Sequence, residues 1–268
     1  MLAGAGLWTH ATYMHYLRRA GRAIPVLFEC VIGLRLENVM VDVLHTVDQG
    51  VASHIIANVL WIMAVVRAVF GSGTQKEKVQ HLFRHMGKWY KRVKENTRVA
   101  GKLTVERIRT SSDWPKLKAK AAATRHLAKY ALELMRTHGN GSADDLALTT
   151  VCELLVRFYE ILESESQFLC ASAKAELPRL GQRLAELYAR LADTALRNDE
   201  RLFKMVPKFH LWEHLTEQQA LEYGNPRYWW TYGDEDLVGL MIEIADSCHP
   251  TTLAVSVLFK WLHVCFDF

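Results

Sequence analysis

The chain has 268 residues, of which 50% are hydrophobic and 23% charged, and its formal net charge is +4. A half-apolar chain of this length can bury a core, which excludes wholesale disorder, and a domain usually takes about 100–200 residues. The five cysteines are an odd number without a CxxC pair, which argues against a disulfide-stapled secreted protein and favours the cytosol or the nucleus.

The charge is unevenly distributed. Residues 73–138 hold 17 Lys and Arg against 5 Asp and Glu, a balance of +12, whereas the rest of the chain holds 16 basic and 24 acidic residues. A strongly basic block inside an otherwise acidic chain indicates a polyanionic partner.

The N-terminal region predicts a helix followed by a strand. Met1 to Gly6 has no charged n-region, so no signal peptide is expected and the protein is not predicted to be secreted. Leu7 to Ala20 is typical of a helix. Leu34 to Leu44 is the best strand candidate because β-branched valines alternate along it, and a turn is expected at Asp48–Gly50.

The segment Val51 to Phe70 is the most apolar of the chain. A membrane-spanning helix needs about 20 predominantly apolar residues. This segment is interrupted by polar side chains, and its uninterrupted part is too short to span. It therefore predicts a buried helix that ends near the glycines of Gly71–Gly73, with no membrane partner.

Helical periodicity continues through the middle of the chain. We expect a basic amphipathic helix, a second helix that begins with a proline in its first turn, a third capped by Ser142 with Asp145, and a fourth. Their expected ranges are Lys76–Arg98, Asp113 to Gly139–Gly141, Ser142 onward, and Leu180–Arg197.

Three clusters of residues are able to carry chemistry. In the first, Asp42 would end the strand and His45 follows three residues later. A carboxylate there is held rigidly at a sheet edge, as a metal ligand must be. The alternative is a turn in which Asp48 caps the next helix.

The second cluster is the sequence Lys208-x-His210-x-x-x-His214. The two histidines share one face of a helix, which suits a zinc pair on spacing, although the HExxH arrangement is absent. Structural histidines and phosphate contacts by Lys208, His210 and His214 are the alternatives.

The third cluster is the acidic triple Asp234–Asp236, which opens a helix expected to run to about Ser247. Acids at a helix N-terminus complement the helix dipole, but an inward-facing acid near Asp42 would require a divalent cation. Cys248, His249, His263 and Cys265 are also able to form a zinc site, with buried thiols as the default.

Together these clusters resemble the distal half of DDE-type, CACTA-like transposases of mobile elements. The resemblance rests on Asp42-x-x-His45, the Lys208/His210/His214 sequence and the late acidic helix. It implies a predominantly α fold with a few strands: a partial RNase H-like α/β core from residues 1–50 and 202–268 that carries a helical insertion, residues 51–201, in one domain. It also implies that Asp42 and Glu235 are catalytic residues and ligands of Mg²⁺ or Mn²⁺.

The first catalytic Asp of that family lies on an earlier strand, and no Asp precedes Asp42 in this chain. Two-metal phosphoryl transfer needs carboxylates that bridge both ions. We therefore expect the chain alone to be catalytically incomplete unless Asp48, Asp234 or Asp236 replaces the missing acid.

The resulting functional prediction is a DNA-binding, transposase-like fragment in the nucleus or cytoplasm, with a homo-oligomer left open. Basic side chains would contact the phosphate backbone, which gives affinity without sequence information. The alternatives are a non-enzymatic helical interaction protein with a solvated basic face, and a peripheral membrane protein. The predicted nucleic-acid contacts are Lys88, Lys91, Arg92, Lys94, Arg98, Arg107, Arg109, Lys208, His210 and His214.

Overall fold

The computed structural model describes residues 9–110 and 113–266. Helices make up 71% of the structure, which confirms the prediction of a predominantly α fold. No strand occurs anywhere in these described residues. An RNase H-like core is built on a sheet, so this part of the prediction is not supported.

The chain forms two compact units, Met1–Tyr228 and Trp229–Phe268. Their association into one domain stays a prediction. The α-helices of the first unit are α1 (His10–Arg19), α2 (Val26–Cys30), α3 (Ala52–Trp61), α4 (Gln75–Val93), α5 (Val105–Ile108), α6 (Ala121–His138), α7 (Ala143–Ser164), α8 (Ala171–Arg197), α9 (Lys208–Glu213) and α10 (Ala220–Tyr223). The second unit contains α11 (Tyr232–Asp246) and α12 (Leu253–Phe266), which pack against each other.

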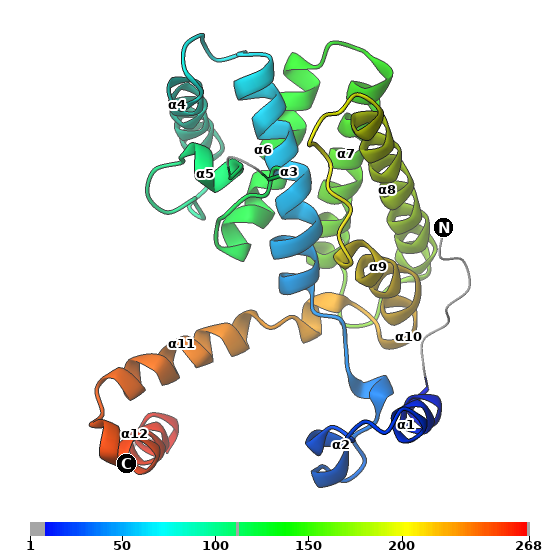
Figure 1. The fold of residues 1–268 in the computed structure, drawn as a ribbon, viewed down its shortest axis with the longest axis vertical. Coiled ribbons are helices and arrows are strands. Elements are labelled where there is room, and N and C mark those ends of the chain that lie inside the picture. The colour runs from blue at the N-terminus through cyan, green and yellow to red at the C-terminus, as the bar shows by residue number, and fades with distance from the viewer. Residues whose placement is uncertain (1–8, 111–112, 267–268) are drawn as a thin grey trace. The chain divides into compact units, whose positions relative to one another are not determined.

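A single continuous helix forms the centre of the first unit. It begins with the π-helical segment Leu44–Val51, continues through α3 and ends with the π-helical segment Ile62–Val66. Residues 50–65 are all buried. Helices α6 and α7 pack along α3, and α8 packs on α7, so that four helices lie side by side (Figure 1). The segment Leu44–Val66 is apolar enough to cross a membrane, but 83% of its most apolar window is buried inside the protein, as expected of a core helix.

The strand predicted over Leu34–Leu44 is wrong. Its last residue begins the central helix, and the turn expected at Asp48–Gly50 is likewise part of that helix. The backbone of the preceding residues is paired by a side chain: Gln219 accepts a hydrogen bond from the N–H of Val41 at 2.7 Å and donates to the carbonyl of Val39 at 3.4 Å. This amide therefore takes the place that a neighbouring strand would have had.

The helix predicted to begin at Asp113 begins instead at Ala121. Residues 113–120 before it form no helix: Lys116 donates its backbone N–H to Ile108, Leu117 to Ser53 and Lys118 to Arg107. These bonds tie the basic loop after α4 to α5 and to the central helix. The predicted helix end at Gly139–Gly141 and the Ser142 cap, whose Oγ accepts from the N–H of Asp145 at 3.2 Å, are both confirmed.

The remaining predicted helices are present with shifted ends. The basic helix α4 starts with a Thr74–Glu77 capping box and ends before Lys94, which is left-handed. Helix α8 begins nine residues earlier than expected and includes Pro178. Within the described part, α1 confirms the first predicted helix and α11 confirms the helix opened by the acidic triple.

Candidate nucleic-acid interface

Asp42 lies at the start of the central helix and caps it. Its carboxylate accepts hydrogen bonds from the backbone N–H of Leu44 at 3.2 Å and of His45 at 2.7 Å. It also lies 2.6 Å from Nδ1 of the His45 ring. The capping role that we had considered for Asp48 thus belongs to Asp42.

The structure brings Lys208 to this pair from 163 residues away in the sequence. Its ammonium group donates to the carbonyl oxygen of His45 at 2.5 Å. A Cβ atom on Gly50 would lie 2.5 Å from Cδ of Lys208, so glycine is required where the lysine stem crosses the helix. Two of the clusters recognised in the sequence, Asp42/His45 and Lys208, therefore form one site.

The described acids do not fit the Mg²⁺ or Mn²⁺ that the transposase resemblance implies. The Asp42 carboxylate is already directed at two N–H groups and a histidine ring. Asp48 is fully buried and accepts a 2.5 Å hydrogen bond from the Tyr159 hydroxyl. Hard cations need several oxygen ligands directed at one point, and the described residues contain no group of three or more His, Cys, Asp or Glu able to hold a metal.

The acids of the third cluster lie in the second unit. Asp234, Glu235 and Asp236 are all exposed at the start of α11, where they complement the helix dipole. The pairing of Asp42 with Glu235 at a metal stays a prediction.

The zinc site considered for Cys248, His249, His263 and Cys265 stays a prediction. Cys248 donates its thiol to the Ile244 carbonyl at 3.2 Å, and Nδ1 of His249 lies 2.6 Å from Oγ1 of Thr251. His263 makes a hydrogen bond within its own helix. The side chain of Cys265 lies outside the described residues.

Some of the predicted phosphate contacts on α4 and just after it are exposed, and others have partners within the protein. Lys88 and Lys91 are exposed and, with Arg84, recur on one face of α4. Arg92 instead forms an ion pair with Glu133. Arg98 lies 5.7 Å from the Tyr90 ring centroid, and Lys94 is exposed at the helix end.

Arg107 and Arg109 hold the basic loop together. The guanidinium of Arg107 donates to the backbone carbonyls of Ala100, Lys102 and Lys118 at 2.6–3.0 Å. Arg109 donates to the carbonyl of Asp113 at 2.8 Å and lies 4.8 Å from the Trp61 ring centroid. Only Arg109 also belongs to the charged cluster described next.

Five cations from two distant segments act on one another or on the buried His54, and two of them lie over the Trp114 ring. This cationic cluster consists of Arg109, Lys116, Arg201, Lys204 and Lys208. The Arg201 guanidinium lies 5.9 Å and the Lys204 ammonium 5.1 Å from the Trp114 ring centroid. Burial and then the charge of Arg201 lower the pKa of Arg109, while burial and then Lys116 lower the pKa of Lys208. The cations are therefore close enough to repel one another.

A buried histidine lies beneath the cluster. His54 is 5% exposed, and its Nδ1 faces the Pro115 carbonyl at 3.0 Å. Burial, together with the charges of Lys116, Lys204 and Lys208, lowers its pKa to about 4. Two carboxylates act on the cluster: Asp113 pairs with Lys204 at 3.6 Å, and Asp42 acts on Lys208. A concentration of cations of this kind attracts an anion.

His210 and His214 lie on α9 and on the π-helical segment His214–Gln219 that follows it. Their Nε2 atoms are 3.0 Å apart. Glu213 and Glu217 lie on the same side of this helix, so the surface is less suited to phosphate than the cationic cluster. Nucleic-acid contact by these histidines stays a prediction.

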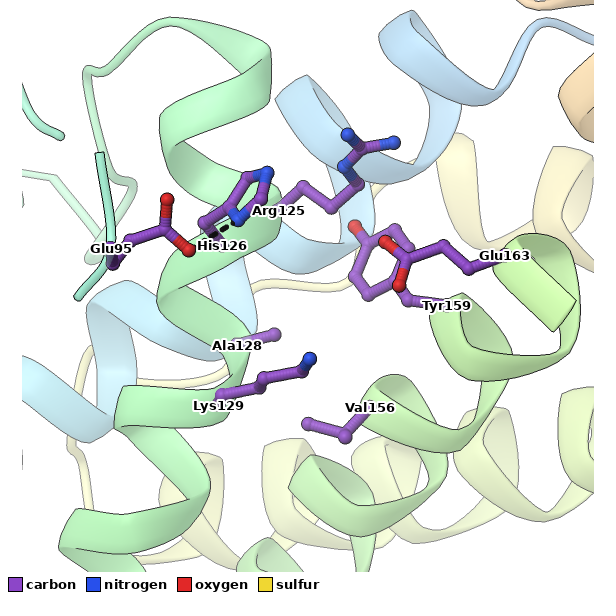
Figure 2. A pocket seen from close by; sticks show the side chains of 8 residues that line it. All are labelled: Glu95, Arg125, His126, Ala128, Lys129, Val156, Tyr159 and Glu163. Atoms are coloured by element: carbon purple, nitrogen blue, oxygen red, sulfur yellow. Dashed lines mark hydrogen bonds and ion pairs between the residues drawn. The ribbon is translucent and has the colours of Figure 1, made fainter. Parts of the chain in front are cut away.

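A cavity of about 120 Å³ lies between α6 and α7 (Figure 2). In Figure 2, Arg125 and Lys129 of α6 face Tyr159 and Glu163 of α7 across it. His126 at its edge pairs with Glu95 at 2.7 Å. Sites for small ligands usually enclose about 300–1,000 Å³, so this cavity has room for water only.

Sequence reasoning missed Lys116, Arg201 and Lys204. Lys116 lies within the basic block, but Arg201 and Lys204 lie outside it in a segment without a charge run. Compared with known proteins, the chain matches no family model, no curated protein and no solved structure.

Proposed function

We propose that this chain binds the phosphate backbone of DNA through the cationic cluster around Trp114. The observation that supports the proposal is the convergence of five cations from residues 109–116 and 201–208, held by stacking and backbone bonds although they repel one another. Repulsion among the cations raises the free energy of the surface when no anion is bound. A bound phosphate neutralises part of this charge and lowers that free energy.

The exposed face of α4 would extend this surface. Helix α4 contacts α5, and α5 leads directly to Arg109. Lys88 and Lys91 would then contact further phosphates along the duplex. Contacts of this kind fix the position of a protein on DNA but do not read its sequence, so binding should depend weakly on base composition.

We propose that the resemblance to transposases reflects common ancestry with those enzymes. It is supported by the meeting of Lys208 with the Asp42/His45 pair, since these motifs are far apart in the sequence. Phosphodiester cleavage is not part of the proposal, because the described residues contain neither the sheet nor the acid cluster on which that chemistry depends. A DNA-binding role would place the protein in the nucleus.

The test is fluorescence anisotropy with a labelled DNA duplex between 50 and 200 mM salt. If each cation of the cluster releases one counterion, the cluster contributes about −4.5 to the slope with which the logarithm of affinity falls against the logarithm of salt, and contacts by Lys88 and Lys91 make the slope steeper. The double variant Lys116→Gln/Lys204→Gln should reduce the magnitude of this slope by about 1.8.

The matched control is Lys174→Gln/Arg183→Gln, which removes the same charge from exposed positions of α8. It should leave the slope unchanged. Equal weakening by both double variants would mean that net charge alone attracts DNA. No binding of the unaltered chain at 50 mM salt would refute the proposal and leave the alternative of a helical interaction protein with a solvated basic face.

A further inference from the structure

The helix that follows Pro207 presents two histidine rings to each other on its outer side. The ring centroids of His210 and His214 are 4.3 Å apart, and the two Nε2 atoms are 3.0 Å apart. The opposite side of the same helix is anchored in the core by Phe209 and Trp212, both buried. The helix is therefore fixed, while the side chain of His210 is 45% exposed and reachable from solvent.

The neighbours of the rings determine where the imidazole protons lie. Nδ1 of His214 is 2.8 Å from Oε1 of Gln218, and an amide oxygen is only able to accept, so this Nδ1 carries the proton. Nδ1 of His210 faces a carboxylate oxygen of Glu213 at 3.5 Å, which favours the same tautomer. With both rings neutral the two Nε2 lone pairs then point at each other, and this arrangement is stabilised either by a proton shared as an Nε2–H···Nε2 hydrogen bond or by a metal ion that takes the place of that proton.

We propose that His210 and His214 bind one divalent transition-metal ion, of the class of Zn²⁺ or Ni²⁺, through their Nε2 atoms. Zinc–nitrogen bonds are about 2.0–2.1 Å long. Two nitrogens 3.0 Å apart reach such an ion at an angle of about 90°, and a separation of about 3.4 Å gives the tetrahedral angle. A small rotation of the exposed His210 ring would increase the separation of the two nitrogens to the larger value. Water molecules would occupy the remaining coordination positions of the metal.

The charges around the rings match a divalent cation. The Glu213 carboxylate lies 3.5 Å from Nδ1 of His210, and Glu217 is close enough for the charges of Glu213 and His214 to act on it. A divalent ion would relieve the repulsion between the two carboxylates. Imidazole nitrogens suit Zn²⁺, Ni²⁺ and Cu²⁺, whereas Mg²⁺ prefers oxygen ligands. This site is thus different in chemistry from the magnesium site implied by the transposase resemblance, and it is independent of the proposed DNA binding.

The test is isothermal titration calorimetry of the full chain, freed of metal by a chelator, with Ni²⁺ at pH 7.5. Nickel is the probe because Cys30 and Cys170 are exposed and thiolates compete for Zn²⁺. We expect one Ni²⁺ per chain. His210→Ala and His214→Ala should each weaken binding at least tenfold, and Gln218→Leu should weaken it about tenfold because the His214 ring loses its orienting partner.

His15→Ala is the matched control, since it removes an exposed histidine from α1 and should leave Ni²⁺ affinity unchanged. Circular dichroism verifies the fold of each variant, and His210→Gln replaces any alanine variant that does not fold. Titration at pH 5.5 should abolish binding, because protons compete for the imidazole nitrogens. Equal Ni²⁺ affinity of the unaltered chain and of His210→Ala/His214→Ala would overturn the proposal, as would the absence of binding to the unaltered chain. Neither result would bear on DNA anisotropy.

Discussion

The histidine beneath the cationic cluster should make the fold sensitive to acid. The pKa of His54 is lowered to about 4, chiefly by burial and further by the charges of Lys116, Lys204 and Lys208. In the unfolded chain a histidine titrates near 6.5. As the pH falls below 6.5, the unfolded state therefore takes up the proton first. The stabilisation is complete above the unfolded pKa and is lost progressively towards pH 4.

The size of the effect follows from the two pKa values. A difference of one pKa unit corresponds to 1.36 kcal/mol, and proton linkage then gives a loss of about 2 kcal/mol between pH 7.5 and pH 5 from this one side chain. Urea denaturation at the two pH values measures the free energy of unfolding. Carboxylates elsewhere also titrate in this interval, so the comparison requires a variant.

The variant is His54→Gln, which keeps a donor for the Pro115 carbonyl but does not titrate. Its free energy of unfolding should fall by about 2 kcal/mol less than that of the unaltered chain over the same interval. An identical loss in both proteins would refute the reasoning. Addition of DNA should reduce the acid sensitivity of the unaltered chain, because phosphate would screen the lysines that help to keep His54 neutral.

Three further substitutions test the packing of the first unit, each by urea denaturation. Arg67→Ala removes the partner of the buried Asp145, to which Arg67 donates two hydrogen bonds at 2.6 and 2.5 Å, and should cost about 2–3 kcal/mol; no loss would mean that the pair is only a surface contact. Gly181→Ala would place a Cβ 2.0 Å from Oγ1 of Thr216 and should cost about 1–3 kcal/mol, whereas an unchanged stability would show that the two helices are able to separate. Lys94→Gly should stabilise by up to about 1 kcal/mol because Lys94 is left-handed with φ of 57°, and a destabilised variant would contradict that conformation.

The helical architecture was predictable where local signals agree with burial. Ser142 caps α7 as its sequence indicates, and the apolar residues of the central helix are buried as its composition predicts. The strand prediction failed because the described residues offer no strand beside the valines at 39, 41 and 43. Gln219, 178 residues beyond Val41, satisfies that backbone instead, and no local pattern reveals such a contact.

The candidate site was predictable only in part. Asp42, His45 and Lys208 were recognised by their motifs, and Arg109 by its place in the basic block. Lys204 and Arg201 are not predicted from the sequence, because a count of charges along the chain detects only runs of charged residues. In the folded protein these two side chains lie over Trp114, which is far away in the sequence. Phosphate contact by Arg107 stays a prediction, and the sequence does not reveal that its guanidinium also binds three backbone carbonyls.

The central helix has a consequence for how the protein is made. Its segment Leu44–Val66 is covered partly by residues that follow much later: Phe203 donates its backbone N–H to Asn58, and α9 packs on Leu44–Val51. At a synthesis rate of about 5–20 residues per second, the ribosome needs roughly 7–30 s to reach Phe203 after completing this segment. During that interval part of an apolar helix of membrane-spanning length stays uncovered in the nascent chain. Its biogenesis should therefore depend on chaperones that shield such segments, and chains that stop before Phe203 should aggregate.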